Sequence, residues 1–276
     1  MKKYVLYDSI IDVNSTSPLV KSTNKLFRFL NIKVPSLKNV PRDIGCESIG
    51  LDENAFHDAN AKILSLVTEA KSDIVCAEDS SFLSLNLTLS KLKEDEKFKS
   101  AMEEKYQISP EINILSLADF LVNEVGITKI KKNIKNSFEK FNAALYLGSY
   151  QCQVKRYSDN SNYNKLLETI GLNLVDYDLK NQVCGYEIND VNSALSYKLA
   201  GSLMLDIFDN AADFVVISDA RSFVMFDKHQ KELEKRVGRD IDLSVFGIAE
   251  LLLLSFGVVN KSDIGLDNHA VEVKLI

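Results

Sequence analysis

The stretch Asn-Lys-Leu-Phe at residues 24–27 returns as Asn-Lys-Leu-Leu at residues 164–167, a spacing of 140 residues. Later positions keep this spacing in the same order, and the matched pairs are Leu30 and Ile170, Ile32 and Leu172, Val34 and Leu174, Ala61 and Gly201, Asp73 and Asp213, and Val75 and Val215. The spacing is 141 at Ser81 and Ser222, and it falls to 131 at Ala118 and Ala249. Such an ordered series of matches indicates a duplicated unit.

The duplicated unit has the pattern of an α/β structure. In each copy the apolar residues predict a buried first strand, an amphipathic helix, a short strand, a second helix, a third strand and a last short strand before a terminal helix. The predicted strands are 4–7, 32–34, 73–75 and 111–115, then 143–147, 172–175, 213–217 and 240–243, and the second helices are 54–70 and 191–210. Alternating strands and helices imply two tandem pseudo-symmetric repeats, 1–141 and 142–276, each a small mostly parallel sheet flanked by helices.

Composition narrows the class of protein. The chain has 276 residues, of which 46% are hydrophobic and 26% charged, and its net charge is −6. These values are typical of a globular protein, and the acidic charge argues against a nucleic-acid partner. The most apolar window, 251–259, is too short to span a membrane. Asp8 and Asp12 interrupt the apolar start that a signal peptide needs, so we expect a cytoplasmic protein.

A basic segment, 127–141, joins the two repeats. Its lysines invite a nucleic-acid interpretation, but the acidic total favours a solvated helix face between two halves that pack together. Because parallel sheets place their ligand sites at the carboxyl ends of strands, we expect any chemistry directly after the first and third strands of each repeat.

The residues at those positions resemble the cysteine-rich CCG family, which includes the B subunit of heterodisulfide reductase and subunits of succinate dehydrogenase-like and glycolate oxidase complexes. The second half is the closer match. Its stretches 144–149, 181–185 and 213–223 are similar to the opening strand with its Gly-Cys, to the Cys-Cys-Gly, and to the strand with its Cys-Pro-x-Cys. The resemblance implies two repeats whose five cysteines hold iron–sulfur clusters.

Most of those cysteines are replaced in this chain. The second repeat has Ser149, Val183, Cys184, Asp219 and Ser222 at the five positions, and the first has Ser9, Gly45, Cys46, Glu78 and Ser81. Only one cysteine remains at the motif positions of each repeat, and Cys76 and Cys152 lie off the motif. Since a cluster normally needs four thiolates, we expect no iron–sulfur cluster and no other cofactor.

The remaining residues leave five interpretations open. Cys46 with Glu78, or Cys184 with Asp219, offers sulfur and oxygen ligands to zinc, although the favoured alternative is that both thiols are buried small hydrophobes. Either thiol could instead be redox-active if its pKa were lowered. Glu78 and Asp219 could also act as an acid–base pair, if the repeats bring them together. For these two carboxylates we favour the fifth interpretation, in which they are N-caps of the helices that follow their strands.

Other polar residues form no recognisable constellation. His57, His229 and His269 are far apart in the sequence and are predicted to lie at the surface, and no nucleotide-binding, nucleophile-elbow or zinc-protease motif is present. A group of tyrosines and cations could face a polar ligand or a partner, or simply lie in a packed loop. Its members are Tyr150, Lys155, Arg156, Tyr157 and Tyr163.

The symmetric loss of cysteines beside an intact apolar pattern predicts a cluster-less, non-catalytic relative of the heterodisulfide reductase B subunit that has a binding or assembly role in a complex. The resemblance implies a protein partner, such as a subunit of a redox complex. The alternative is an oxidoreductase-related enzyme, or a thiol or metal protein, that uses Cys46 and Cys184 with Glu78 and Asp219 at the former cluster positions.

Overall fold

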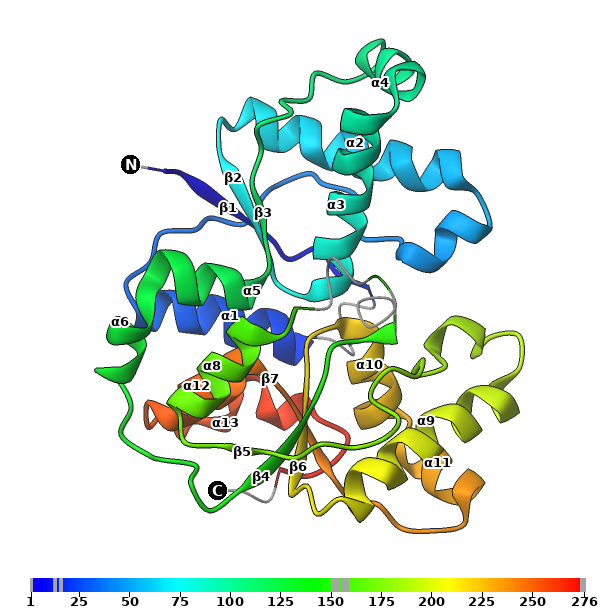
Figure 1. The fold of residues 1–276 in the computed structure, drawn as a ribbon. Coiled ribbons are helices and arrows are strands. Elements are labelled where there is room, and N and C mark those ends of the chain that lie inside the picture. The colour runs from blue at the N-terminus through cyan, green and yellow to red at the C-terminus, as the bar shows by residue number, and fades with distance from the viewer. Residues whose placement is uncertain (1, 12–13, 15–16, 150–153, 155–158, 274–276) are drawn as a thin grey trace.

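The computed structural model describes all of the chain except residues 1, 12–13, 15–16, 150–153, 155–158 and 274–276. Two parallel sheets, each flanked by helices, follow one another along the chain (Figure 1). This is the α/β tandem architecture that the repeat predicts.

The first sheet has the strand order β1-β2-β3, and all its strands are parallel. Its strands are β1 (Tyr4–Tyr7), β2 (Asp73–Cys76) and β3 (Ile114–Leu115). The helices around it are α1 (Ser17–Phe29), η1 (Cys46–Gly50), α2 (Glu53–Glu69), α3 (Asp79–Glu94), α4 (Glu96–Glu103), α5 (Leu117–Asp119), η2 (Phe120–Gly126) and α6 (Ile127–Lys131). Short apolar runs form these strands because helices cover both faces of the sheet.

The second sheet repeats this order with one more strand, as β5-β4-β6-β7, again parallel. Its strands are β4 (Asn142–Tyr146), β5 (Asn173–Leu174), β6 (Phe214–Ile217) and β7 (Ser244–Gly247). The helices are α8 (Ser161–Thr169), η4 (Tyr186–Ile188), α9 (Ser193–Asp209), α10 (Ala220–Phe223), η5 (Val224–Lys228), α11 (Gln230–Val237), α12 (Ile248–Ser255), α13 (Lys261–Ile264) and η6 (Leu266–Asn268). In the first sheet the place of β5 is taken by a single parallel bridge between Leu6 and Ser36.

Two predicted strands differ from the structure. Residues 32–34 form no strand, because the chain pairs with β1 only at Ser36, two residues further on. The last strand of the second repeat is predicted at 240–243 but is Ser244–Gly247. Residues 240–243 are instead a loop, in which Asp242 has a positive φ of 50° and a side chain of α11 binds the backbone.

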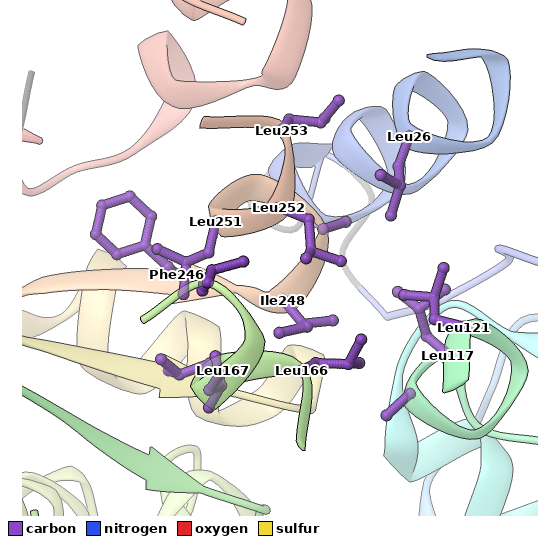
Figure 2. Packing of buried hydrophobic residues seen from close by; sticks show 14 of the residues in the cluster. Leu26, Leu117, Leu121, Leu166, Leu167, Phe246, Ile248, Leu251, Leu252 and Leu253 are labelled. Carbon is purple, nitrogen blue, oxygen red and sulfur yellow. The ribbon is translucent and has the colours of Figure 1, made fainter. Parts of the chain in front are cut away.

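The repeats share one large hydrophobic cluster because each lends a helix to the other. Helix α1 of the first repeat packs on α12 and α13 of the second, and α8 of the second packs on α5 and α6 of the first. Figure 2 shows the resulting cluster, in which Leu26 of α1 faces Leu252 of α12 and the fully buried Leu166 of α8 lies near Ile248. Because each fully buried leucine contributes about 1.5–3 kcal/mol, separating the repeats would expose much of the core.

The basic segment 127–141 begins with α6, which has the solvated lysine face that the sequence predicts. Helix α6 inserts the fully buried Ile130 between the halves, while Lys129 and Lys131 on the same helix are exposed. Within the described ranges, no helix is long and apolar enough to cross a membrane.

Candidate functional site

Glu78 and Asp219 occupy equivalent positions, each at the carboxyl end of a strand and at the N-cap of the next helix. Glu78 accepts the backbone N–H of Ser81 at 2.7 Å and also the Ser81 hydroxyl. Asp219 accepts the backbone N–H of Ser222 at 3.0 Å and the Ser222 hydroxyl. The capping prediction is therefore confirmed in both repeats. Such caps typically stabilise by about 1 kcal/mol each.

The two caps lie against each other across the interface between the repeats. The N–H of Ala220, next to Asp219, donates to Glu78 Oε2 at 3.2 Å. In return, the N–H of Asp79, next to Glu78, donates to the Ser218 carbonyl at 2.9 Å. The ends of β2 and β6 are thus joined by hydrogen bonds in both directions, one to a side-chain carboxylate and one between backbone groups.

Arg221 of the second repeat forms ion pairs with acidic residues of the first repeat, across the same interface. Only 3% of it is exposed. Its Nε lies 2.8 Å from Glu47 Oε1 and its Nη1 lies 2.9 Å from Asp43 Oδ2. Nη1 also donates to the Ser80 hydroxyl at 2.7 Å. Burial lowers the pKa of Arg221, but Asp43 and Glu47 raise it well above its ordinary value, so the guanidinium is charged.

Two glycines make room for these charged groups. Gly45 has a φ of 79°, and a Cβ there would collide with the Arg221 guanidinium and the Glu47 carboxylate. Gly148 has a φ of 91°, and its Cβ would collide with the Asp219 carboxylate. The left-handed backbone and the absence of a side chain are both needed at these positions.

Carboxyl groups outnumber cations at this interface among the residues that the structure describes. Burial, and then Asp43, raises the pKa of Glu78 to about 7, although Arg221 acts in the opposite direction. Burial also raises the pKa of Asp79 well above its ordinary value and raises that of Asp219. Neither carboxyl oxygen of Asp79 has a hydrogen bond of ordinary geometry, so little offsets the cost of burying its charge.

The thiols of Cys46 and Cys184 are buried, and their hydrogen-bond partners differ. Cys184 Sγ accepts the Ser149 hydroxyl at 3.3 Å, and Ser149 Oγ in turn accepts the Cys184 N–H at 2.9 Å. Cys46 Sγ lies 3.4 Å from the hydroxyl of Ser84, a residue outside the motif. Burial raises the pKa of Cys46 to about 12 and raises that of Cys184 as well. Both thiols are therefore protonated at neutral pH, the state least suited to nucleophilic or metal chemistry.

A small cavity of about 10 Å³ remains at the interface. It is lined by residues of both repeats, among them Asp79, Ser80, Ser149, Asp219 and Arg221. This volume has room for about one water molecule. In the described residues, no three His, Cys, Asp or Glu side chains are grouped so that they could hold a metal ion.

The remaining predicted site residues lie beside the interface or outside the described part of the chain. Ser9 follows β1, as expected, and its carbonyl accepts the Asp43 N–H at 3.0 Å. Tyr163 is buried on α8, where it lies close enough to Asp79 to act on its pKa. The other members of the predicted tyrosine and cation group, Tyr150, Lys155, Arg156 and Tyr157, lie outside the described residues, as does Cys152.

Two residues that the sequence did not single out, Asp43 and Arg221, dominate the electrostatics. The sequence holds a weak indication for Arg221, because it is a cation that lies between the motif positions 219 and 222. The sequence holds no indication for Asp43, because its partner Arg221 is 178 residues away.

The expectation of surface histidines was wrong for two of the three. His57 is 4% exposed and its Nδ1 lies 2.9 Å from the Thr88 hydroxyl. The His269 side chain is 1% exposed, with Nε2 at 2.8 Å from Glu250 Oε1 and Nδ1 at 3.4 Å from Asp227 Oδ1. Burial lowers the pKa of His269, but Glu250 and Asp227 raise it to about 9. Both histidines are buried against polar groups of other elements, Thr88 for His57 and Glu250 for His269, while His269 Nδ1 has no hydrogen bond of ordinary geometry.

The fold and the site define an α/β protein with two parallel sheets whose strand ends meet at a charged interface. Residues 186–270 match the family model of the HdrB-like C-terminal domain. The B subunit of the ferredoxin:CoB-CoM heterodisulfide reductase of Methanosarcina acetivorans is 24% identical over 187 residues, which are 64% of this chain and 59% of that protein. The chain is thus related to the HdrB-like proteins of the CCG family, as the residue pattern predicts.

A solved structure supports the fold over the whole chain. A hypothetical protein from Helicobacter pylori superposes on 100% of this chain with a TM-score of 0.82 at 20% identity, and the match covers 53% of that protein. The chain therefore spans little more than half the length of the relatives that it matches.

Proposed function

We propose that this chain is a cluster-less relative of the heterodisulfide reductase B subunit, with a binding or assembly role in a complex rather than a role as an electron carrier. The observation that carries the proposal is the interface between the repeats. There, Glu78 and Asp219 replace cysteines and are engaged as helix caps, while Arg221 binds acidic groups of the other repeat. These positions now hold the repeats together.

The donor set does not fit the iron–sulfur cluster that the family implies. One thiol remains at the motif positions of each repeat, and the motif thiols of both repeats are buried with raised pKa values. The cavity between the repeats accommodates about one water molecule, far less than a cluster of several iron and sulfur atoms. We therefore propose that the chain works without a resident cofactor.

A repeated apolar feature favours a protein partner. Leu51 and Val191 are 88% and 89% exposed, and they are separated by 140 residues, which is the repeat spacing. Each directly precedes the N-cap of a long helix, Asp52 for α2 and Asn192 for α9. The neighbouring η1 and η4 both contact Arg221, through Glu47 and Tyr186. Exposed apolar side chains at matching places suit a partner protein that contacts both repeats.

The first test is anaerobic purification of the full chain, followed by iron, sulfide and zinc analysis and an absorption spectrum. The proposal predicts substoichiometric amounts of all three. One or more clusters per chain would overturn it and restore electron transfer, and stoichiometric zinc would replace it by a metal site at Cys46 or Cys184.

The second test is capture of a partner from cells of the chain's own organism. The doubly substituted Leu51→Glu/Val191→Glu chain should lose a protein that the unchanged chain retains. Val259→Glu is the matched control, because Val259 is 71% exposed but lies outside this pair. If the unchanged chain, the double variant and the Val259→Glu control all capture the protein equally, Leu51 and Val191 do not form the partner surface.

The alternative is an enzyme of changed chemistry, and one observation favours it. The pKa of Glu78, about 7, suits a general base, and its neighbour Asp219 lines the cavity. This alternative predicts turnover that depends on Glu78 and a thiol that reacts rapidly in the folded protein. Slow alkylation of both motif cysteines would argue against its thiol form.

A further inference from the structure

The two repeats differ in length at one place. The spacing between matched residues falls from 141 at Ser81 and Ser222 to 131 at Ala118 and Ala249, so the first repeat has ten residues more between these points. In the second repeat α11 ends at Val237 and the chain reaches β7 at Ser244. In the first repeat the corresponding segment holds α4 and a long loop before β3, at the top of the view in Figure 1. The second repeat folds without such an element.

This added element borders a half-open pocket of about 380 Å³ between α3, α4 and the loop. Its lining is mainly apolar. Leu89, Leu92 and Met102 are 6%, 8% and 9% exposed, and the half-buried Tyr106 and Ile108 complete the wall. A volume of this size and an apolar lining are typical of small-molecule sites.

Cations lie at the rim of the cavity. Lys93 is exposed and forms no ion pair with the described residues, and Lys99 has only a 3.8 Å contact with the exposed Glu96. One acid, Glu103, also lines the rim, so the three rim charges sum to +1. Because exposed ion pairs are weak, both lysines are available to an anionic group.

We propose that this cavity binds a medium-chain fatty acid, with its hydrocarbon chain against Leu92 and Met102 and its carboxylate between Lys93 and Lys99. The apolar lining matches the chain and the net positive rim matches the carboxylate. The proposal is independent of the function proposed above, because none of these residues belongs to the interface between the repeats.

The test is calorimetric titration of the full chain with octanoate, decanoate and decanol. Each methylene should tighten binding about fourfold, so decanoate should bind about 16-fold more tightly than octanoate. Decanol should bind about tenfold more weakly than decanoate, because it lacks the charge. Failure to bind decanoate, or equal affinity for decanol and decanoate, would overturn the proposal.

Two variants test the placement of the ligand. Met102→Trp fills the cavity and should weaken decanoate binding at least tenfold. Lys93→Met/Lys99→Met alters exposed residues, so it should fold normally and weaken decanoate but not decanol. The matched control is Lys129→Met on α6, which should leave both affinities unchanged. If neither variant changes the affinity for decanoate, the ligand lies elsewhere and the proposal is wrong.

Discussion

Replacing Arg221 by methionine removes a buried guanidinium from the interface between the two repeats while keeping much of its aliphatic stem. The substitution leaves Asp43, whose side chain is 2% exposed, without its partner, and Glu47 and Ser80 also lose a hydrogen bond. Breaking a buried ion pair in this way typically costs about 3–5 kcal/mol. We expect the free energy of unfolding to fall by that amount at about pH 8.

The loss should depend on pH, because Arg221 lowers the pKa of Glu78. Since burial raises the pKa of Glu78 to about 7, its protonated form stabilises the fold below its ordinary pKa, and this contribution disappears as the pH rises through the folded value. Without Arg221 the folded pKa rises further, so ionisation of Glu78 costs more at high pH. The variant should therefore be closer to wild type at about pH 5 than at about pH 8.

Urea unfolding followed by circular dichroism measures both effects. Arg239→Met is the matched control, because Arg239 is half exposed and its pair with Asp209, at 2.7 Å, lies at the surface. The control should lose less than about 1 kcal/mol. Adding Asp43→Asn to Arg221→Met should recover part of the stability. A loss below about 1 kcal/mol at about pH 8, or an equal loss at both pH values, would refute the reasoning.

Three further predictions concern other described residues. Cys46 and Cys184 should react with a thiol reagent at neutral pH only after denaturant is added, because both pKa values are raised by burial; rapid reaction of the native protein would contradict this. The pKa of His269 is raised to about 9, so its stabilisation is complete below its ordinary pKa of 6.5 and is lost as the pH rises through 9. His269→Gln should abolish this dependence, and an NMR titration midpoint below 6.5 would exclude the charged triad. Gly185→Ala should lower the melting temperature more than Gly238→Ala, since a Cβ at Gly185 meets the Ser196 carbonyl at 2.8 Å while Gly238 faces open space. Equal losses would mean that the positive φ alone, worth about 1–2 kcal/mol, sets the cost.

The sequence by itself determined the duplicated α/β unit and most of its strands. The apolar runs at 4–7 and 213–217 predict strands because hydrophobic periodicity is a local property, and a carboxylate between a strand and a helix predicts a cap for the same reason. The recurrence of these signals in the same order, at spacings of 131 to 141 residues, also predicted the pseudo-symmetry of the two sheets. The sequence does not predict the shift of the last strand to Ser244–Gly247, because the side-chain oxygens of Glu234 and Gln230 accept the backbone N–H groups of residues 241–243 and hold them in a loop.

The tertiary structure alone decided how the repeats are joined. Nothing in the sequence near α1 indicates that it packs on α12, since α1 is simply apolar on one face and α12 is buried all round. The contact between Arg221 and Asp43 spans 178 residues, and His269 is buried only because Asp227 and Glu250 come from separate helices. Burial and ion pairing depend on which surfaces meet after the chain has folded, and that information is absent from any local stretch of the sequence.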